Sequence, residues 1–229
     1  MKKDRNLRSV NTDGGVNLQF KLLSAIGIII IVSGHCYHGG MELAYNWFPP
    51  YSYNLALFVF ISGYFYKTDY EENVGKYIWK RTKRLLIPAY LWNIFYGGMV
   101  AFLGLFGFTI GAKPDLYNLF VMPFVDGEAF QYNLGSWFVY PLFLVCIINV
   151  LFRKFLKLIH LDNEFIVLIV YLAIGMIGIN TAIENQTAIN GIVKLLVRTM
   201  FFLPCYEFGR FYKAAVSYTH LRAHETCAD

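Results

Sequence analysis

The stretch AIGIIIIVSGHCYHGG, residues 25–40, joins a nearly pure isoleucine and valine run to three titratable side chains, His35, Cys36 and His38. A helix needs about 20 mostly apolar residues to cross the hydrocarbon of a bilayer, so residues 18–37 are predicted to span it. Imidazole titrates near neutral pH and suits a general base; an interfacial histidine bonded to a carbonyl is the alternative. The three side chains place at most two on one helical face, so we predict no metal site.

The composition is typical of an integral membrane protein. The chain has 229 residues, 57% of them hydrophobic and 15% charged, whereas a soluble domain carries roughly 25% charged residues. Aromatic residues make up 18%, as expected where rings sit at membrane interfaces. The formal charge of +5 does not indicate a nucleic-acid partner, because the basic residues share no soluble face. The four cysteines have no paired spacing, which indicates neither a disulfide framework nor a zinc site.

Six segments have the length and composition of membrane spans, and they predict an all-α, polytopic transmembrane helix bundle. The segments are about 18–37, 51–67, 85–108, 132–152, 163–182 and 190–212. The third is long enough to tilt, or to break near Gly97 and Gly98. The loop GAKPDLYNLFVMPFVDGEAFQYN, residues 111–133, is too apolar to be simply solvated, so we expect it to fold back onto the bundle.

The distribution of Lys and Arg predicts the orientation of the bundle. Basic residues lie before the first span and in every second connection: Lys2, Lys3, Arg5, Arg8, Lys67, Lys76, Lys80, Arg81, Lys83, Arg84, Arg153, Lys154, Lys157, Arg210 and Lys213. The alternate connections hold only Lys113. By the positive-inside rule the N-terminus is cytoplasmic, and His35 lies toward the outer end of its helix.

The end of the chain differs from the rest. VSYTHLRAHET, residues 216–226, resembles the read-through translation of a transposase sequencing adapter. We therefore interpret residues 214–229 as an artefactual tail, residues 1–17 as a cytoplasmic segment and residues 18–213 as an incomplete transmembrane domain. We expect the natural protein to continue beyond this point and the fragment to be inactive by itself. The short polar tail of a complete protein is the alternative.

Two further motifs contain candidate site residues. In LFVFISGYFYK, residues 57–67, the Ser62-Gly63 pair allows another helix backbone to approach closely, and Ser62 is also a candidate to bond the imidazole or a substrate. In KRTKRLLIPAYLW, residues 80–92, Arg81 and Arg84 lie one turn apart and form a candidate phosphate clamp. Contact of these arginines with anionic lipid is the alternative.

Charged and aromatic residues elsewhere in the spans are candidates for substrate binding. Arg198 and Glu207 lie within the sixth span, and we expect each to pair with another helix. Trp137 begins the fourth span at the outer interface, where a membrane anchor is the alternative, and Tyr140 is placed to line a cavity. Lys21 enters the first span near the cytoplasmic edge and can snorkel.

Together these segments resemble the acyltransferase-3 family of multi-span membrane acyltransferases, over roughly residues 17–213. The IVSGH end of the first span matches the catalytic-histidine motif of that family. Other matches are the Phe-rich Ser-Gly segment, the Arg-x-x-Arg element with its following proline, GSWFVYPL at 135–142 and FFLPCYEFGRFYK at 201–213. The residues that carry them are His35, Phe58, Phe60, Ser62, Gly63, Arg81, Arg84, Pro88, Trp137 and Phe138. The family usually has a basic residue where this chain has Ser24, and Lys21, one turn earlier, is the expected substitute.

The resemblance implies a fold, a reaction and partners. The family fold has about ten helices of about 20 residues each, so about six are expected here. The implied reaction is transfer of an acyl group, most often acetyl, from acyl-CoA to a hydroxyl of a cell-envelope glycan or a lipid-linked sugar. His35 is the implied catalytic base, and Arg81 and Arg84 hold the phosphates of CoA. Ser62 or Tyr140 is the candidate to orient the histidine or to stabilise the oxyanion. Acyl-CoA is a donor substrate, and no bound cofactor is expected. The implied location is the bacterial cytoplasmic membrane.

Two other functions fit an integral membrane protein with charged residues in its spans. A carrier or flippase for a sugar or an anionic substrate uses such residues as a pathway. It predicts inverted repeats, and the sequence has no visible internal repeat. A membrane domain that anchors or senses for a soluble domain is the third alternative.

Overall fold

The structure is a computed structural model that describes residues 18–36, 50–108, 111, 113–185 and 190–225. Side chains are described for residues 18–32, 54–108, 111, 113–185 and 190–215. The chain divides into two compact units, Met1–Phe58 and Val59–Asp229. The predicted cytoplasmic segment 1–17 lies outside the described residues.

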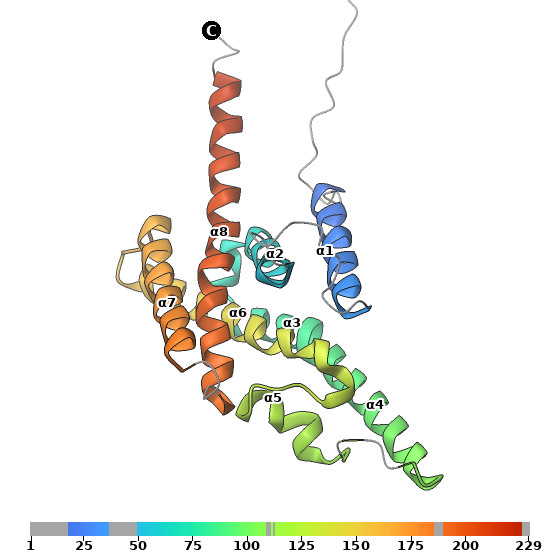
Figure 1. Cartoon of the computed structure of the whole chain (residues 1–229). Helices are drawn as coiled ribbons and strands as arrows, with labels where there is room; N and C mark the ends of the chain where they lie inside the picture. The colour runs from blue at the N-terminus through green and yellow to red at the C-terminus, as the bar shows by residue number, and fades with distance from the viewer. Residues whose placement is uncertain (1–17, 37–49, 109–110, 112, 186–189, 226–229) are drawn as a thin grey trace, which may run out of the picture. The chain divides into compact units, whose positions relative to one another are not determined.

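The described residues form helices and connecting turns, with no strand among them, which confirms the predicted all-α fold (Figure 1). The helices are α1 (Leu18–Cys36), α2 (Pro50–Tyr64), α3 (Val74–Arg81), α4 (Ile87–Leu105), α5 (Met122–Val125), α6 (Val139–Leu158), α7 (Glu164–Asn185) and α8 (Gly191–Glu225). Short 3₁₀ segments are η1 (Thr68–Tyr70) and η4 (Gln131–Phe138), and π-helical turns are η2 (Thr82–Leu86) and η3 (Tyr117–Val121).

Each of the six predicted spans coincides with a helix. Within the described residues, three helical runs are long and apolar enough to cross a membrane: Val74–Leu105, Gln131–Leu158 and Glu164–Asn185. The stretches Leu18–Val32 and Asn54–Tyr64 are apolar but shorter. The sixth span is a continuous helix, α8, that carries several charges in its sequence. α4 runs through Gly97 and Gly98 without a break.

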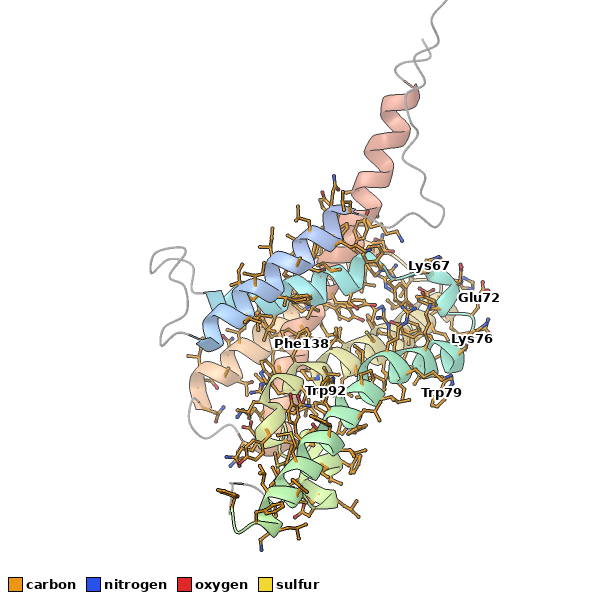
Figure 2. The ribbon with its side chains drawn as sticks, turned by 90° about the vertical axis from the view of Figure 1, so that its right-hand side faces the viewer. Lys67, Glu72, Lys76, Trp79, Trp92 and Phe138 are labelled. Carbon is orange, nitrogen blue, oxygen red and sulfur yellow. The ribbon has the colours of Figure 1, made fainter. Side chains whose placement is uncertain are left out.

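Large apolar side chains face outward along two of the spanning runs, as they do on a lipid-facing surface. On α4 the exposed side chains include Leu91, Trp92, Ile94, Phe95, Met99, Phe102 and Leu105 (Trp92 is labelled in Figure 2). On α7 they include Phe165, Ile166, Ile169, Leu172, Met176, Ile177, Ile179 and Ile183. Monomeric soluble proteins rarely expose apolar patches of this extent. The bundle is therefore an all-α membrane bundle.

The loop at residues 111–133 folds back onto the bundle, as its apolar sequence predicts. The buried side chain of Asn93 on α4 donates to the carbonyl of Leu119 in η3 at 2.7 Å. Gly97 also faces this segment, because a Cβ added there would lie 3.0 Å from the side chain of Leu119 and 3.3 Å from that of Pro114. The loop therefore covers the face of α4 that does not meet lipid.

A proline explains the π-helical turn between α3 and α4. Pro88 has no amide hydrogen for the carbonyl of Arg84, and its ring crowds that carbonyl. The backbone responds by widening: the amide of Ile87 donates to the carbonyl of Thr82, five residues back. The turn lies immediately after Arg81 and includes Arg84, so it changes the relative directions of the two arginines.

Helix α8 packs backbone to backbone against α2 in the second unit. A Cβ added at Gly63 would overlap the carbonyl of Tyr206, and one added at Gly209 would overlap the carbonyl of Phe60. The close approach predicted for the Ser62-Gly63 pair is thereby confirmed, and Gly209 is its counterpart on α8. Small residues commonly allow this approach between membrane helices.

Helix α7 lies alongside α8 (Figure 1) and also meets it through small residues. A Cβ added at Gly175 would lie 2.8 Å from the ring of Pro204, and a Cβ added at Gly178 would lie 2.9 Å from the side chain of Met200. Pro204 interrupts the helical hydrogen bonding of α8. Its ring therefore fits into a notch on α7, the space left by the missing side chain of Gly175. In the first unit, a Cβ added at Gly27 of α1 would lie 3.1 Å from the ring of Phe58.

We expect Gly63→Ala to destabilise the protein, because the added methyl group meets rigid backbone at Tyr206. Overpacking of this kind lowers the free energy of unfolding by about 1–3 kcal/mol. Gly98→Ala is the matched control, since Gly98 lies in the same kind of apolar helix with nothing near its Cβ position. Unfolding in mixed detergent micelles, followed by circular dichroism, measures both. An equal effect of the two changes would contradict the packing.

Candidate functional site

A network of buried charges joins α6, α7 and α8. The Arg153 guanidinium is only 1% exposed, and its Nη2 donates to Glu207 and to Glu164, each at 2.5 Å. Glu207 is fully buried. Arg210, one turn further along α8, donates to the other carboxylate oxygen of Glu164 at 2.7 Å. Glu164, at the first residue of α7, thereby links an arginine of α6 to one of α8.

The connection between α2 and α3 adds a further carboxylate to this network, beside Glu164, Glu207 and Asp162, whose Oδ1 lies 3.6 Å from Arg153 Nη1. Glu71 is buried, its Oε1 lies 3.9 Å from Arg210 Nη1, and it accepts a hydrogen bond of 3.4 Å from Tyr66. Burial raises the pKa of the Glu71 carboxyl, and nearby Asp162 raises it further, whereas Arg210 opposes the rise. A raised pKa favours the neutral acid, which lessens the excess of carboxylates over guanidinium groups here.

Closely packed tyrosines connect the charge network to Arg81. Tyr66 packs edge-to-face on Tyr77 with 5.8 Å between ring centroids, and Arg210 lies 4.5 Å from the centroid of Tyr66. On the other side, Arg81 Nε donates to the Tyr77 hydroxyl at 3.0 Å. Tyr206 of α8 completes the group, with its hydroxyl 3.4 Å from that of Tyr77.

The two arginines of the predicted phosphate clamp lie in different surroundings. Arg81 is half-buried, and among the residues with described side chains no carboxylate lies within ion-pair distance of it. Arg84, inside the π-helical turn, is exposed. Desolvated cations are costly unless an anion or dipoles compensate them. Arg81 is therefore the member of the pair with the properties of an anion-binding group.

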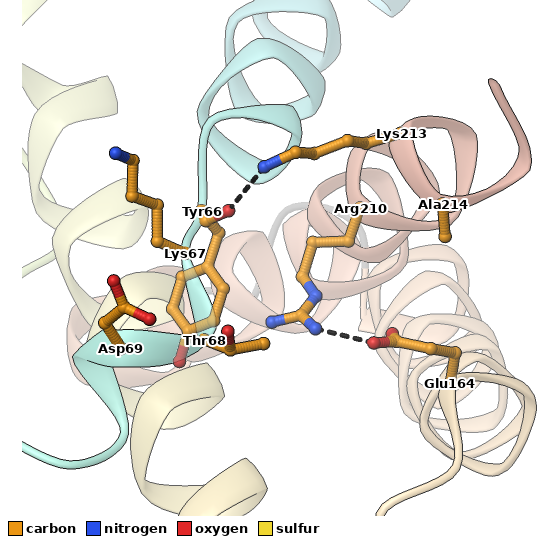
Figure 3. Close-up of a pocket in the computed structure, with 8 residues that line it drawn as sticks. All are labelled: Tyr66, Lys67, Thr68, Asp69, Glu164, Arg210, Lys213 and Ala214. Carbon is orange, nitrogen blue, oxygen red and sulfur yellow. Dashed lines mark hydrogen bonds and ion pairs between the residues drawn. The ribbon is translucent and has the colours of Figure 1, made fainter. Parts of the chain in front are cut away.

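A pocket opens beside the charge network, with a volume of about 380 Å³. It lies between the turn that follows α2 and the facing parts of α7 and α8 (Figure 3). Its lining residues are Tyr66, Lys67, Thr68, Asp69, Glu164, Arg210, Lys213 and Ala214. Lys213 Nζ donates to the backbone carbonyl of Tyr66 at 3.2 Å, which joins the two walls. Lys67 belongs to a group of charged side chains near the start of α3, with Glu72 and Lys76 (Figure 2).

The opposite end of α8 holds Arg198. This guanidinium lies 4.1 Å from the ring centroid of Trp137 and donates to the carbonyl of Gly127 at 2.6 Å. Two of the predicted substrate-binding residues are thus in contact. The partners of Arg198 are a loop carbonyl and the ring of Trp137, which lies in the spanning run Gln131–Leu158, so the expected pairing with another helix is confirmed.

A second pocket lies near this end, with a volume of about 460 Å³. Its lining residues are Asp126, Glu128, Asn190, Gly191 and Lys194. Lys194 pairs with Glu128, which ties α8 to the loop after α5. Tyr140, expected at a cavity, lines neither of the two pockets. It is 1% exposed, packs against Tyr90 and Phe124, and lies 3.5 Å from Asn93 Nδ2.

The chain resembles a known protein family over most of its length. The model of an acyltransferase domain, that of the acyltransferase-3 family, matches residues 17–223. The chain belongs to the acyltransferase-3 family. It matches no curated protein and no solved structure. The family match and the apolar helices together identify a membrane protein of an acyltransferase family.

The structure describes the remaining predicted site residues of this acyltransferase-3 chain to different extents. His35 lies in the last turn of α1, but its side chain is outside the described residues. Ser62 is half-buried on α2, and its hydroxyl has no hydrogen-bond partner among the described residues. Lys21 is exposed on α1, and Ser24 bonds the carbonyl of Phe20 at 2.7 Å. Their roles stay predictions.

Arg153 and the end of α8 differ from what the sequence predicts. The sequence places Arg153 among the charges that follow the fourth span, whereas α6 continues to Leu158 and buries this arginine. The predicted pairing of Glu207 with another helix is confirmed, and the partner is this arginine. Helix α8 continues to Glu225, through part of the segment assigned as an artefactual tail; that assignment stays a prediction.

We expect Arg153→Met to destabilise the chain strongly, because it leaves Glu207 buried without its cation. Removing one partner of a buried pair costs about 3–5 kcal/mol of the free energy of unfolding. Lys154→Met, at the exposed neighbouring position, is the control and should change that energy by about 0.5 kcal/mol or less. Detergent unfolding of both variants measures the difference. Similar losses in both would show that Arg153 acts only as a surface charge.

Proposed function

We propose that the protein transfers an acyl group, most often acetyl, from acyl-CoA to a hydroxyl group of a cell-envelope glycan or lipid-linked sugar. It would act as a multi-pass protein of the bacterial cytoplasmic membrane, with acyl-CoA arriving from the cytoplasm. In this proposal the connection between the second and third spans, which carries Lys67, Lys76 and Arg81, faces the cytoplasm, in keeping with the positive-inside rule.

The observation that carries the proposal is the burial of Arg81 without a carboxylate partner among the described residues. Arg81 is half-buried in a membrane protein of an acyltransferase family, and its described contacts are with a tyrosine. A guanidinium group offers a planar set of donors that matches a phosphate in two places. The diphosphate of CoA would supply the anion that Arg81 lacks among the described residues. Arg84, being exposed, would contribute a longer-range attraction.

The proposed chemistry follows from the resemblance of the IVSGH motif to that of the family. His35 accepts the proton of the acceptor hydroxyl while the oxygen attacks the thioester carbonyl carbon. The carbon–sulfur bond then breaks, and the CoA thiolate leaves with the proton returned by the imidazolium. Ser62 offers a buried hydroxyl that no described residue engages, and we assign it to stabilisation of the oxyanion. Arg198 and Trp137 are proposed to meet the acceptor.

The test is transfer of label from radiolabelled acetyl-CoA to envelope polymer in inside-out vesicles. The vesicles carry the full-length gene product. We expect labelled polymer with the wild type, and a loss of roughly 10²–10⁴-fold with His35→Ala at an unchanged level of inserted protein. Full transfer by the variant would remove His35 as the base. Uptake of substrate without labelling would indicate a carrier instead.

The donor site is tested by changing single cations. We expect Arg81→Gln to raise the KM for acetyl-CoA roughly tenfold with little change in kcat, because a charge-assisted bond to phosphate is lost. Arg84→Gln should raise KM by about threefold or less, as for an exposed ion pair. Lys83→Gln, exposed and stacked on Trp79, is the control and should leave KM unchanged. If Arg81→Gln also leaves KM unchanged, the arginine contacts lipid or protein only.

A further inference from the structure

The pocket beside the charge network has cations that the network does not neutralise. Glu164 is already shared between Arg153 and Arg210. Among the residues with described side chains, no carboxylate lies within ion-pair distance of Lys67 or Lys213, although both line the pocket. Asp69 is the one remaining carboxylate in the lining. Within the lining, the cations Lys67, Arg210 and Lys213 therefore outnumber the carboxylates Asp69 and Glu164 by one, and the two lysines come from opposite walls (Figure 3).

The environment of Lys213 supports this description. Lys213 lies just beyond the predicted sixth span, and burial lowers the pKa of its ammonium group. Arg210 and Lys67 lower that pKa further because like charges repel. An anion placed between these cations would relieve the repulsion. The hydroxyl of Thr68 in the same lining can donate a further hydrogen bond.

We propose that this pocket binds a phosphate monoester, and that its ligand is the 3′-phosphate of the CoA donor. This inference rests on the proposed function. A phosphate monoester carries nearly two negative charges at neutral pH and three acceptor oxygens, which suits two lysines and a hydroxyl. The pocket volume of about 380 Å³ lies within the range of sites for small ligands, so it can hold more than the phosphate alone.

The position of the pocket relative to Arg81 fits a donor held at two points. Arg81 lies 5.2 Å from the ring centroid of Tyr77. Tyr77 packs edge-to-face on Tyr66, and Tyr66 forms part of the pocket lining, so two aromatic rings link Arg81 to the pocket. In CoA the diphosphate and the 3′-phosphate are carried by one ribose. Arg81 would bind the diphosphate, and the lysine pocket would bind the phosphate that distinguishes CoA from dephospho-CoA.

The test compares binding of CoA and dephospho-CoA to the 229-residue chain in nanodiscs of neutral lipid. We expect the wild type to bind CoA about tenfold more tightly, because only CoA has the 3′-phosphate. Lys67→Met combined with Lys213→Met should remove this preference and leave the affinity for dephospho-CoA unchanged. Lys67→Met alone should remove part of it, and this change is at an exposed side chain with no described structural bond. Lys76→Met, an exposed lysine outside the pocket, should retain the full preference.

Equal binding of the two nucleotides by the wild type, or no binding of either, would overturn the assignment. A phosphomonoester lipid is the other source of such a group, so the comparison is repeated with phosphatidic acid in the discs. If the lipid raises the thermal stability of the wild type but not of the double variant, and CoA shows no preference, the pocket binds lipid and the donor assignment fails. Transfer from acetyl-CoA and from acetyl-dephospho-CoA is measured separately, in the inside-out vesicles that carry the full-length gene product. Absence of transfer from both donors there would contradict the proposed function, whereas equal KM values for the two donors would contradict only this inference.

Discussion

The buried ion pair between Arg153 and Glu207 constrains the rest of the second unit. Neither side chain reaches solvent, and an isolated charge in such a place is far costlier than a paired one. Helices α6 and α8 must therefore meet in one register, with the carboxylate of α8 against the guanidinium of α6. Glu164 then fixes the start of α7 to the same arginine. Three helices are held at one end by charges that lipid cannot solvate.

This register determines where two parts of α8 present their functional groups. The middle of the helix brings Arg210 and Lys213 to the turn after α2, next to the tyrosines that contact Arg81. The part nearer the N-terminus of the helix places Arg198 on the ring of Trp137. Between them, Gly209 and the notch that receives Pro204 let α2 and α7 approach the α8 backbone. A single helix thus separates the cation-rich region around Arg210, proposed to receive the donor, from the region around Arg198, proposed to receive the acceptor.

Much of the fold could be predicted from the sequence, because the length of an apolar run has a direct physical meaning in a bilayer. The close contact at Gly63 could also be predicted from local sequence, since only a small residue permits it. The pairing of Arg153 with Glu207 could not, because the two residues are 54 positions apart and the positive-inside rule offers another reason for an arginine at that place. The different surroundings of Arg81 and Arg84 were equally hidden, as they depend on a π-helical turn that Pro88 induces.

The measurement that tests the central constraint most directly is the coupling free energy between Arg153 and Glu207. It is obtained from the unfolding free energies of the wild type, Arg153→Met, Glu207→Leu and the double variant. If each charge is costly mainly because its partner is absent, the double variant will be more stable than Arg153→Met alone, as apolar replacements of buried pairs often are. Losses that simply add in the double variant would contradict the account, because the two side chains would then act independently.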